Sequence, residues 1–275
     1  MTTVLAQLSD LHIREPGRLA YRRLDTAPYL RAAVASILRL PQRPDAVLIT
    51  GDLTDFGRPQ EYRHLADLLK PLPMPVYLMP GNHDDRSGLR RGFPAHPYLG
   101  NGEFVQFSVA IGEIRLIALD TTVPGRPHGA LCRERLSWLE TELDAHVDEP
   151  IILAMHHPPF RSLMEAMDRQ GLLEGAAQLE RIVERHPNVE RIVCGHLHRA
   201  IDVRFGGSIA STAPAPAHQL QFDMAVEAPA EWTLEPPGFK VHVWPGSGRL
   251  VTHTVASGEH EGPYAFYDAN GRLID

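Results

Sequence analysis

Five short polar clusters, each directly after a short apolar run, constrain the fold of this 275-residue chain more than any other feature. Apolar runs of about four to eight residues rich in Val, Ile and Leu are typical of buried strands. Ligand-binding side chains of such sheets gather beyond the carboxyl ends of the strands, so we expect the clusters to converge on one point. The clusters are Asp10-Leu-His12, Gly51-Asp52, Gly81-Asn82-His83-Asp84, His156-His157 and Gly195-His196-Leu-His198.

Strand and helix patterns alternate along most of the chain. The apolar runs predict strands over Val4–Leu8, Ala46–Thr50, Val76–Met79, Ile114–Asp120, Ile151–Met155 and Arg191–Cys194. Apolar residues near helical spacing predict helices over Asp25–Leu40, Gln60–Leu69, Arg133–His146 and Ala176–His186. This alternation favours an α/β architecture with right-handed crossovers.

Two long segments interrupt the alternation, Pro158–Gly175 and the Pro- and Ala-rich Thr212–Pro237. Loops of this length in compact domains are usually functional or mobile, and the sequence leaves open whether 158–175 acts as a lid. The tail predicts further strands at Lys240–Trp244, Val251–Val255 and Tyr264–Tyr267. We treat residues 1–275 as a single domain, with residues 236–275 as a C-terminal strand extension packed on it.

Composition excludes several classes of function. The formal net charge is −7, and no Lys/Arg block is present, so we expect no nucleic-acid partner. Two cysteines, Cys132 and Cys194, provide no disulfide framework. No apolar segment approaches the roughly 20 residues of a spanning helix, and no leader pattern follows Met1, so the prediction is a cytoplasmic protein without a membrane partner.

The clusters contain ligands for two metal ions. Carboxylates, imidazoles and one amide form a mixed O/N ligand set without thiolate, which suits Fe, Mn, Co or Zn alike. In Asp10-Leu-His12 and His196-Leu-His198 the partners are two residues apart, so extended backbone would point both side chains to one side. Asp52 has two oxygens and could bridge two ions. Two divalent ions, two aspartates and a bridging hydroxide leave about one positive charge, which suits a phosphodiester monoanion.

Each cluster alone has an ordinary structural explanation. A single His at a strand end is more often a hydrogen-bonded structural residue, and Asp or Asn beside Gly is more often a turn former. Only the set of five, in order, favours a catalytic centre. Other candidates are better explained by packing or solvation: Cys194, Met164 and Met167 as packing groups, and Arg14, Arg18, Arg22 and Arg23 as a solvated face.

The series D-x-H, GD, GNHD, H and GHxH resembles the calcineurin-like metallophosphoesterases. The segments Pro44–Asp55, Tyr77–Asp85, Met155–Pro159 and Cys194–His198 look like those of class III cyclic-nucleotide phosphodiesterases and the related bacterial glycerophosphodiesterases. Ala217-His218-Gln219 and Gly262-Pro263-Tyr264 also look like the latter group, although the sequence assigns no role to His218.

This resemblance implies a four-layer αββα sandwich with a small cap, and a specific division of ligands. One metal would be held by Asp10, His12, Asp52 and His198, and the other by Asp52, Asn82, His156 and His196. His157 would be a neighbour and not a ligand. His83 would face the substrate and either stabilise the transition state or protonate the leaving oxygen, and Asp84 would orient its imidazole through a hydrogen bond.

The predicted function is hydrolysis of small phosphodiesters, either glycerophosphodiesters or cyclic nucleotides, by attack of a metal-bound hydroxide. Two alternatives remain at this point: a phosphomonoesterase or protein phosphatase on the same metals, and a non-catalytic interaction module. A nuclease is opposed by the acidic charge balance. Homo-oligomerisation is suggested by the resemblance and by the strand-rich tail.

Overall fold

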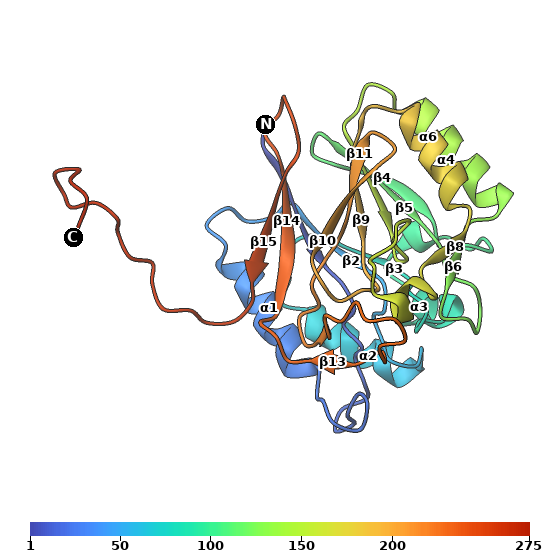
Figure 1. Cartoon of the computed structure of the whole chain (residues 1–275), viewed down its shortest axis with the longest axis horizontal. Helices are drawn as coiled ribbons and strands as arrows, with labels where there is room; N and C mark the ends of the chain where they lie inside the picture. The colour runs from blue at the N-terminus through green and yellow to red at the C-terminus, as the bar shows by residue number, and fades with distance from the viewer.

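The computed structural model describes residues 1–275, and two sheets form its centre (Figure 1). The first sheet has five strands in the order β15-β14-β1-β2-β3. Strands β1, β2 and β3 are mutually parallel, β14 pairs antiparallel with β1, and β15 pairs antiparallel with β14. Their bounds are β1 Thr3–Leu8, β2 Ala46–Thr50, β3 Val76–Met79, β14 Gly238–Trp244 and β15 Val251–Ala256.

The second sheet has six strands in the order β10-β11-β9-β7-β5-β4. Its inner strands β11, β9, β7 and β5 are parallel, and antiparallel β10 and β4 close the two edges. The bounds are β4 Phe107–Ile111, β5 Ile114–Leu119, β7 Ile151–Met155, β9 Val189–Cys194, β10 Ile201–Phe205 and β11 Ser208–Thr212.

Helices cover the outer face of each sheet. Helices α1 (Ala27–Arg39), α2 (Pro59–Leu69) and α3 (Arg86–Gly92) belong to the first sheet, and α4 (Arg133–Ala145) and α6 (Ala176–Glu184) cover the second (Figure 1). Smaller elements are the 3-10 turn Pro97–Leu99, α5 (Glu165–Asp168), β6 (Gly129–Ala130) with β8 (Leu172–Glu174), and β12 (Gln219–Leu220) with β13 (Trp232–Thr233). No helix has the length and apolar character needed to cross a membrane.

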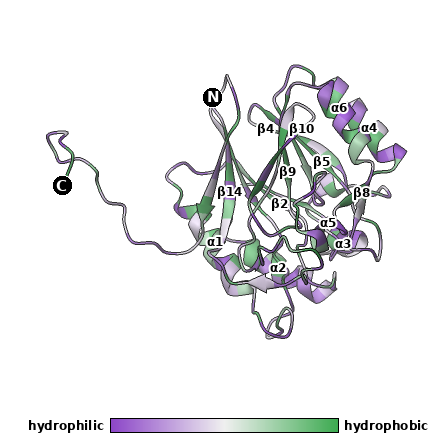
Figure 2. Cartoon of the chain, in the orientation of Figure 1, coloured by the Kyte–Doolittle hydropathy of each residue, from purple (hydrophilic) through white to green (hydrophobic).

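Three separate cores fill the spaces between the four layers. Because side chains alternate along a strand, Val4 and Ala6 of β1 pack toward α1 and α2 while Leu5 packs between the sheets. The third core lies between the second sheet and α4 and α6, and includes Leu139 and Leu179. Figure 2 shows apolar colouring along the strands and hydrophilic colouring on the outward turns of α4 and α6. The predicted αββα sandwich is confirmed.

Most predicted strands and helices occur within one or two residues of their expected bounds. The predicted strand Tyr264–Tyr267 is wrong: this segment has only an isolated bridge between Tyr267 and Leu273, because no neighbouring strand of either sheet reaches it. Strands β14 and β15 are integral to the first sheet, and residues beyond Ser257 extend away from the body (Figure 1). The division into a domain and a C-terminal extension stays a prediction.

Candidate metal centre

Every predicted ligand lies just after the carboxyl end of a central strand. Asp10 and His12 follow β1, Asp52 follows β2 and Asn82 follows β3. From the second sheet, His156 follows β7, and His196 and His198 follow β9. The parallel strands of the two facing sheets end at the same side of the sandwich, which brings residues almost 190 positions apart into contact, as His12 and His198 are.

The loop backbones at these positions are not extended. Asp10, His12, Asp52, His196 and His198 have φ between 45° and 70°, in the left-handed region that side chains other than Gly rarely adopt. The expectation that extended backbone aligns the Asp-x-His and His-x-His pairs is therefore wrong. Tight left-handed turns direct the side chains inward instead. Such strain persists where the surrounding structure fixes the conformation, which is typical of functional sites.

The first ligand group comprises Asp10, His12, Asp52 and His198, of which the first three are buried and His198 is partly buried, and their ligand atoms lie within 4.8 Å of one another. His12 Nε2 lies 3.2 Å from His198 Nε2 and 3.6 Å from Asp52 Oδ2. His198 Nε2 lies 3.6 Å from Asp10 Oδ1. Four donor atoms thus surround one point.

The second group lies on the other side of Asp52. Asn82 Oδ1 is 3.1 Å from His156 Nε2 and 3.1 Å from His196 Nδ1. His156 Nε2 is also 3.4 Å from Asp52 Oδ1. Asp52 therefore directs Oδ2 toward the first group and Oδ1 toward the second, which is the arrangement that a carboxylate bridging two cations requires.

Hydrogen bonds leave the converging nitrogens free for a cation. The Nδ1 atom of each of three imidazoles is hydrogen-bonded to an oxygen: His12 to Asp55 Oδ1 at 3.3 Å, His156 to Thr50 O at 2.8 Å, and His198 to His218 O at 3.2 Å. When these imidazoles are neutral, as metal binding requires, each Nε2 carries a lone pair. Two such lone pairs facing at 3.2 Å, as in His12 and His198, would repel unless a cation lay between them. This donor set, with its outer hydrogen bonds, fits a divalent metal pair.

Burial and charge act in opposite directions on these side chains. Burial lowers the pKa of His196 to about 3 and of His198 to about 4, so both are neutral ligands at pH 7. Burial also acts to lower the pKa of His156, but the nearby Asp52 carboxylate outweighs it and raises that pKa to about 9. Although burial favours protonation of Asp52, His156 and His83 hold its pKa well below the usual value.

His83 lies at the exposed side of the centre. Its Nδ1 donates to the carbonyl oxygen of Asp55 at 2.9 Å, and its Nε2 is 4.0 Å from Asp52 Oδ2. The imidazole is about one-third exposed, unlike the ligands. Its free nitrogen therefore faces both the metal site and the solvent-accessible pocket, as expected for a group that meets substrate.

The predicted hydrogen bond from Asp84 to His83 is wrong. The Asp84 carboxylate instead accepts bonds from Leu53 N, Thr54 N, Thr54 Oγ1, Tyr62 Oη and Gly81 N, at 3.0–3.2 Å. The left-handed turn at Asp52 brings these donors to Asp84, while Asp55 lies under His83. Asp84 thus ties the loop after β2 to the loop after β3, and Asp55 orients the imidazole.

Glycines allow the loops to pass each other closely. A Cβ at Gly81 would overlap Asp52 Oδ1 and approach His156 Cε1 to 2.8 Å. Gly51 has φ +93°, and a Cβ there would lie 2.5 Å from His156 Nδ1. The Gly in each Gly-Asp and Gly-Asn pair is therefore required by contact distances as well as by the turn.

A polar network beneath the centre connects the sheets. Gln7 Nε2 donates to Thr50 Oγ1 and to Cys194 O, both at 3.0 Å, and Gln7 Oε1 accepts from His242 Nε2 at 3.0 Å. Thr50 and Cys194 end the strands that lead into the Asp52 and His196 turns. Gln7 therefore fixes the position of β2 relative to β9, two ligand-bearing strands from different sheets.

An open pocket of about 260 Å³ extends from the centre. Its walls come from the two long segments: Met167 and Gln170 from one, and His218 and Trp232 from the other. Tyr21 lies opposite, with its ring centroid 5.6 Å from that of Trp232. The sequence assigned no role to Asp55, Tyr21, Gln170 or Trp232. Asp55 ends a recognisable segment but has no signal for a contact with His83. The other three lie in loops, and the sequence does not show where those loops fold. Met167, expected to pack, instead lines this pocket.

Several residues left open by the sequence have structural roles. His157 engages Thr121 Oγ1 and Pro127 O through its two nitrogens, which leaves neither for a metal. Arg14 pairs with Asp55 Oδ2 at 3.2 Å, while Arg18, Arg22 and Arg23 are exposed. Cys194 and Met164 are buried, in agreement with packing roles.

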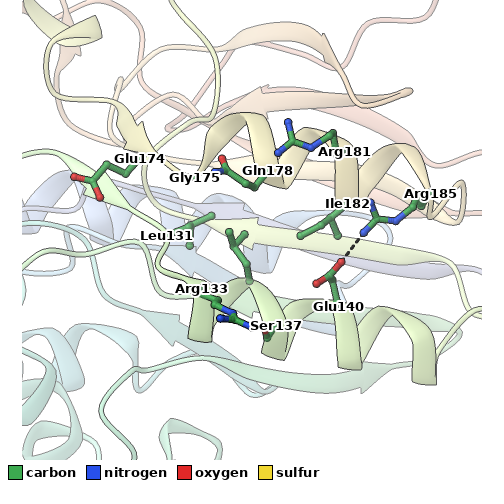
Figure 3. A pocket seen from close by; sticks show the side chains of 11 residues that line it. Leu131, Arg133, Ser137, Glu140, Glu174, Gly175, Gln178, Arg181, Ile182 and Arg185 are labelled. Carbon is green, nitrogen blue, oxygen red and sulfur yellow. Dashed lines mark hydrogen bonds and ion pairs between the residues drawn. The ribbon is translucent and has the colours of Figure 1, made fainter.

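A second hollow, about 820 Å³, lies between α4 and α6, away from the metal ligands (Figure 3). Its wall contains Arg185, which pairs with Glu140, and exposed Arg133 and Glu174. No histidine lines this hollow.

The fold and the two ligand groups that share Asp52 define a metal-dependent hydrolase of the four-layer α/β class. The family model for calcineurin-like phosphoesterases matches residues 3–200. This chain therefore belongs to the calcineurin-like phosphoesterases, and the predicted family is confirmed.

Similar proteins agree over nearly the whole length. A probable glycerophosphodiester phosphodiesterase of Arcobacter nitrofigilis is 37% identical and covers 99% of this chain and 100% of its own. A probable cyclic nucleotide phosphodiesterase of Rhodopseudomonas palustris is 36% identical, with 95% of each chain covered. A dimetal phosphatase from Danio rerio superposes with a TM-score of 0.64 at 17% identity, over 93% of this chain and 99% of that one, which shows the shared fold.

Proposed function

We propose that this enzyme hydrolyses small phosphodiesters at a dinuclear metal centre held by Asp10, His12, Asp52, Asn82, His156, His196 and His198. The observation that carries the proposal is the bridging orientation of Asp52, with one oxygen toward each ligand group. Two bound divalent ions would supply positive charge for the phosphate oxygens and lower the pKa of a water to near neutrality. Fe, Mn, Zn and Co remain open, because the ligand set suits each.

The protein side chains orient the substrate and move protons. His83 keeps Nδ1 bound to the Asp55 carbonyl, so its Nε2 can pass a proton to the leaving alkoxide oxygen. Tyr21 and Trp232 provide apolar walls for the leaving group, and Gln170 adds one amide. The pocket of about 260 Å³ suits small substrates.

Diesterase activity is favoured over monoesterase activity by the relatives named as phosphodiesterases over nearly the full chain length. These names favour glycerophosphodiesters and cyclic nucleotides as candidate substrates. A non-catalytic module is not favoured, because relatives over nearly the full chain length are named as phosphodiesterases, and the convergence of the proposed ligand side chains supports catalysis. A cytoplasmic location, an absence of nucleic-acid binding and homo-oligomerisation stay predictions.

The test is a kinetic panel after Mn²⁺ reconstitution. We expect kcat/KM for bis-p-nitrophenyl phosphate to exceed that for p-nitrophenyl phosphate, because the residual charge of the centre suits a monoanion. Glycerophosphodiesters and cyclic nucleotides, compared in the same assay, then identify the substrate class. A preference for the monoester would contradict diesterase function, and the Asp52→Ala variant is the inactive control.

A further inference from the structure

We propose that a hollow beside α3 binds a second phosphate group, carried by the substituent that stays on phosphorus during hydrolysis. The preferred substrates are then phosphodiesters whose retained substituent bears a further phosphate. This inference rests on the proposed phosphodiesterase function and goes beyond it by naming a substrate class and the residues that select it.

This hollow, called the α3 hollow below, adjoins the metal centre. It has a volume of about 440 Å³ and shares Asn82 with the pocket that contains His83 and Trp232. Because the leaving group lies beside His83 in that pocket, the retained substituent of a tetrahedral phosphate must extend in another direction. The α3 hollow borders the same centre and provides that space. Its remaining walls come from α3, from Gly102 and Glu103, and from residues 122–125 of the loop after β5.

Arg86 is held rigidly in the wall of the α3 hollow. Its Nε donates to Asp120 Oδ2 at 2.6 Å, and its Nη2 donates to Asp120 Oδ1 at 3.2 Å and to Thr122 O at 2.9 Å. The Phe104 ring lies against the guanidinium, with its centroid 5.1 Å from Cζ. Nη1 makes no hydrogen bond and is reached by solvent, so its two N–H groups are free for a ligand.

Arg90 is held in the same way, by carbonyl oxygens alone. Its Nε donates to Leu99 O at 3.2 Å, and its Nη2 donates to Gly102 O and Phe104 O at 2.8 and 3.1 Å. Its Nη1 is also unbonded and reached by solvent. Both guanidinium groups are therefore fixed before a ligand arrives, which lowers the entropy that binding costs.

Positive charge exceeds negative charge behind this wall. Arg135 is 5% exposed, its Cζ lies 4.5 Å from the Phe104 centroid, and its Nε has no hydrogen-bond partner. Among Arg86, Arg90 and Arg135, only Arg86 pairs with a carboxylate, that of Asp120. Buried charge is costly without a partner, so an anion in the α3 hollow would be stabilised there.

The carboxylates that line the α3 hollow do not pair with its arginines. Asp85 Oδ1 accepts from Gly88 N at 2.5 Å and lies 3.7 Å from Arg91 Nη2. The Asp84 carboxylate binds the loops after β2 and β3, and Glu103 is exposed to water. The charges of Arg86 and Arg90 thus remain available to a ligand.

The donor set favours a phosphate over a carboxylate. Two Nη1 atoms together provide four N–H groups, and Ser87 of the same wall adds a hydroxyl. A terminal phosphate has three oxygens that can accept these bonds and carries nearly two negative charges, whereas a carboxylate has two oxygens and one charge. Guanidinium groups match phosphate oxygens well in geometry.

The test compares two esters that differ by one phosphate, thymidine 5′-(p-nitrophenyl phosphate) with and without a 3′-phosphate. In both, water displaces p-nitrophenol from phosphorus and the thymidine stays on the phosphate. We expect the 3′-phosphate to raise kcat/KM of the Mn²⁺-loaded enzyme by about tenfold or more, mainly through a lower KM. Equal kcat/KM values for the two esters would overturn the proposal.

Variants assign the preference to the α3 hollow. Ser87→Glu adds a carboxylate at an exposed residue of its wall without removing a bond of either arginine, and the ratio of the two kcat/KM values should fall to about one. Arg91→Gln is the matched control, because it changes the charge of α3 by the same unit outside the hollow, and its ratio should equal that of the natural enzyme. An unchanged ratio in Ser87→Glu, or an equal fall in the control, would refute the site.

Arg90→Gln removes one donor directly and should also abolish the preference. Arg90 holds three carbonyl oxygens, so circular dichroism must first show that this variant is folded. If it is not folded, Ser87→Glu decides. A folded Arg90→Gln variant with the natural ratio would exclude Arg90 from the site.

Binding without turnover separates this inference from the proposed function. Calorimetry compares thymidine 5′-phosphate with thymidine 3′,5′-bisphosphate on the same Mn²⁺-loaded proteins. We expect the bisphosphate to bind about tenfold more tightly to the natural chain and equally to Ser87→Glu. If bis-p-nitrophenyl phosphate is not hydrolysed but this difference is present, only the proposed function fails. If it is hydrolysed and the difference is absent, only the phosphate site fails.

Discussion

Single residues of the centre combine a contact to the site with a contact that fixes their orientation. Asp52 faces both ligand groups, and His83 presents Nε2 because Nδ1 is bound to the Asp55 carbonyl. The orientation of each imidazole therefore depends on the backbone of a neighbouring loop as much as on its own residue.

His83→Ala should lower kcat by about 10²–10⁴, because the leaving oxygen loses its proton donor. The metal content should stay the same, because His83 belongs to neither ligand group. Steady-state kinetics with metal analysis of the same sample measures both quantities. Full activity in the variant would remove His83 from the mechanism.

His242 gives a residue-scale prediction about pH. Burial, assisted by Lys240 and Arg191, lowers the pKa of His242 to about 3, below the ordinary value of about 6.5 for histidine. Between pH 3 and pH 6.5 the unfolded chain therefore binds a proton at this residue that the folded protein does not. The stability contributed by neutral His242 is present above pH 6.5 and is lost as the pH falls.

Between pH 7 and pH 5 this one group should remove about 2 kcal/mol from the free energy of unfolding. His242→Gln should decrease the pH dependence by that amount, whatever its effect at pH 7. Urea denaturation of both proteins at the two pH values tests it. If the free energy of unfolding of both proteins changed equally between pH 7 and pH 5, His242 would be protonated in the folded protein at pH 5.

At the scale of elements, the site is an assembly of loops held at fixed distances by hydrogen bonds. Asp84 ties the loop after β2 to the loop after β3, and Gln7 ties the ends of β2 and β9. The long segments after β7 and β11 then form the pocket walls. Ligand geometry therefore depends on residues that never contact a metal.

Asp84→Asn should destabilise the fold by roughly 2–4 kcal/mol, because an amide group replaces a carboxylate oxygen and leaves buried donors such as Leu53 N or Gly81 N without an acceptor. Chemical denaturation at pH 7 measures this loss. The exposed Asp67→Asn control should change stability by less than about 0.5 kcal/mol. Comparable effects of the two substitutions would contradict the role of Asp84.

At the scale of the whole molecule, the two sheets supply complementary parts of one centre, and their ligand-bearing strands come from different halves of the chain. The first sheet supplies Asp10, His12, Asp52 and Asn82, and the second supplies His156, His196 and His198. A bound metal pair therefore connects the sheets, and its binding is coupled to the folded state.

Removal of metal by a chelator should lower the melting temperature, and Mn²⁺ should restore it. Ligand at about 100 times its dissociation constant contributes about 2.7 kcal/mol. Differential scanning calorimetry of both forms measures the shift. Asp52→Ala should reduce the shift strongly, and a melting temperature independent of metal in the natural protein would argue against the site.

The sequence predicted which side chains converge, because strand ends are a local signal. Residues such as Asp10 and His156 follow short apolar runs, and the runs themselves identify the strands. The strand at Tyr264–Tyr267 was predicted wrongly, because local β propensity cannot show whether a pairing partner is within reach. Asp55, to which the sequence assigned no role, orients His83 in place of Asp84, because the left-handed turn at Asp52 is invisible in the residue pattern.

The sequence by itself determined the α/β alternation, the family and the residues that converge at the strand ends, since side-chain type and periodicity are carried by neighbouring residues. Only the tertiary structure decided which oxygen of Asp52 faces which ligand group, what orients His83, and which aromatic rings line the pocket. These features depend on distances between segments far apart in the chain, and such distances are fixed by packing of the two sheets.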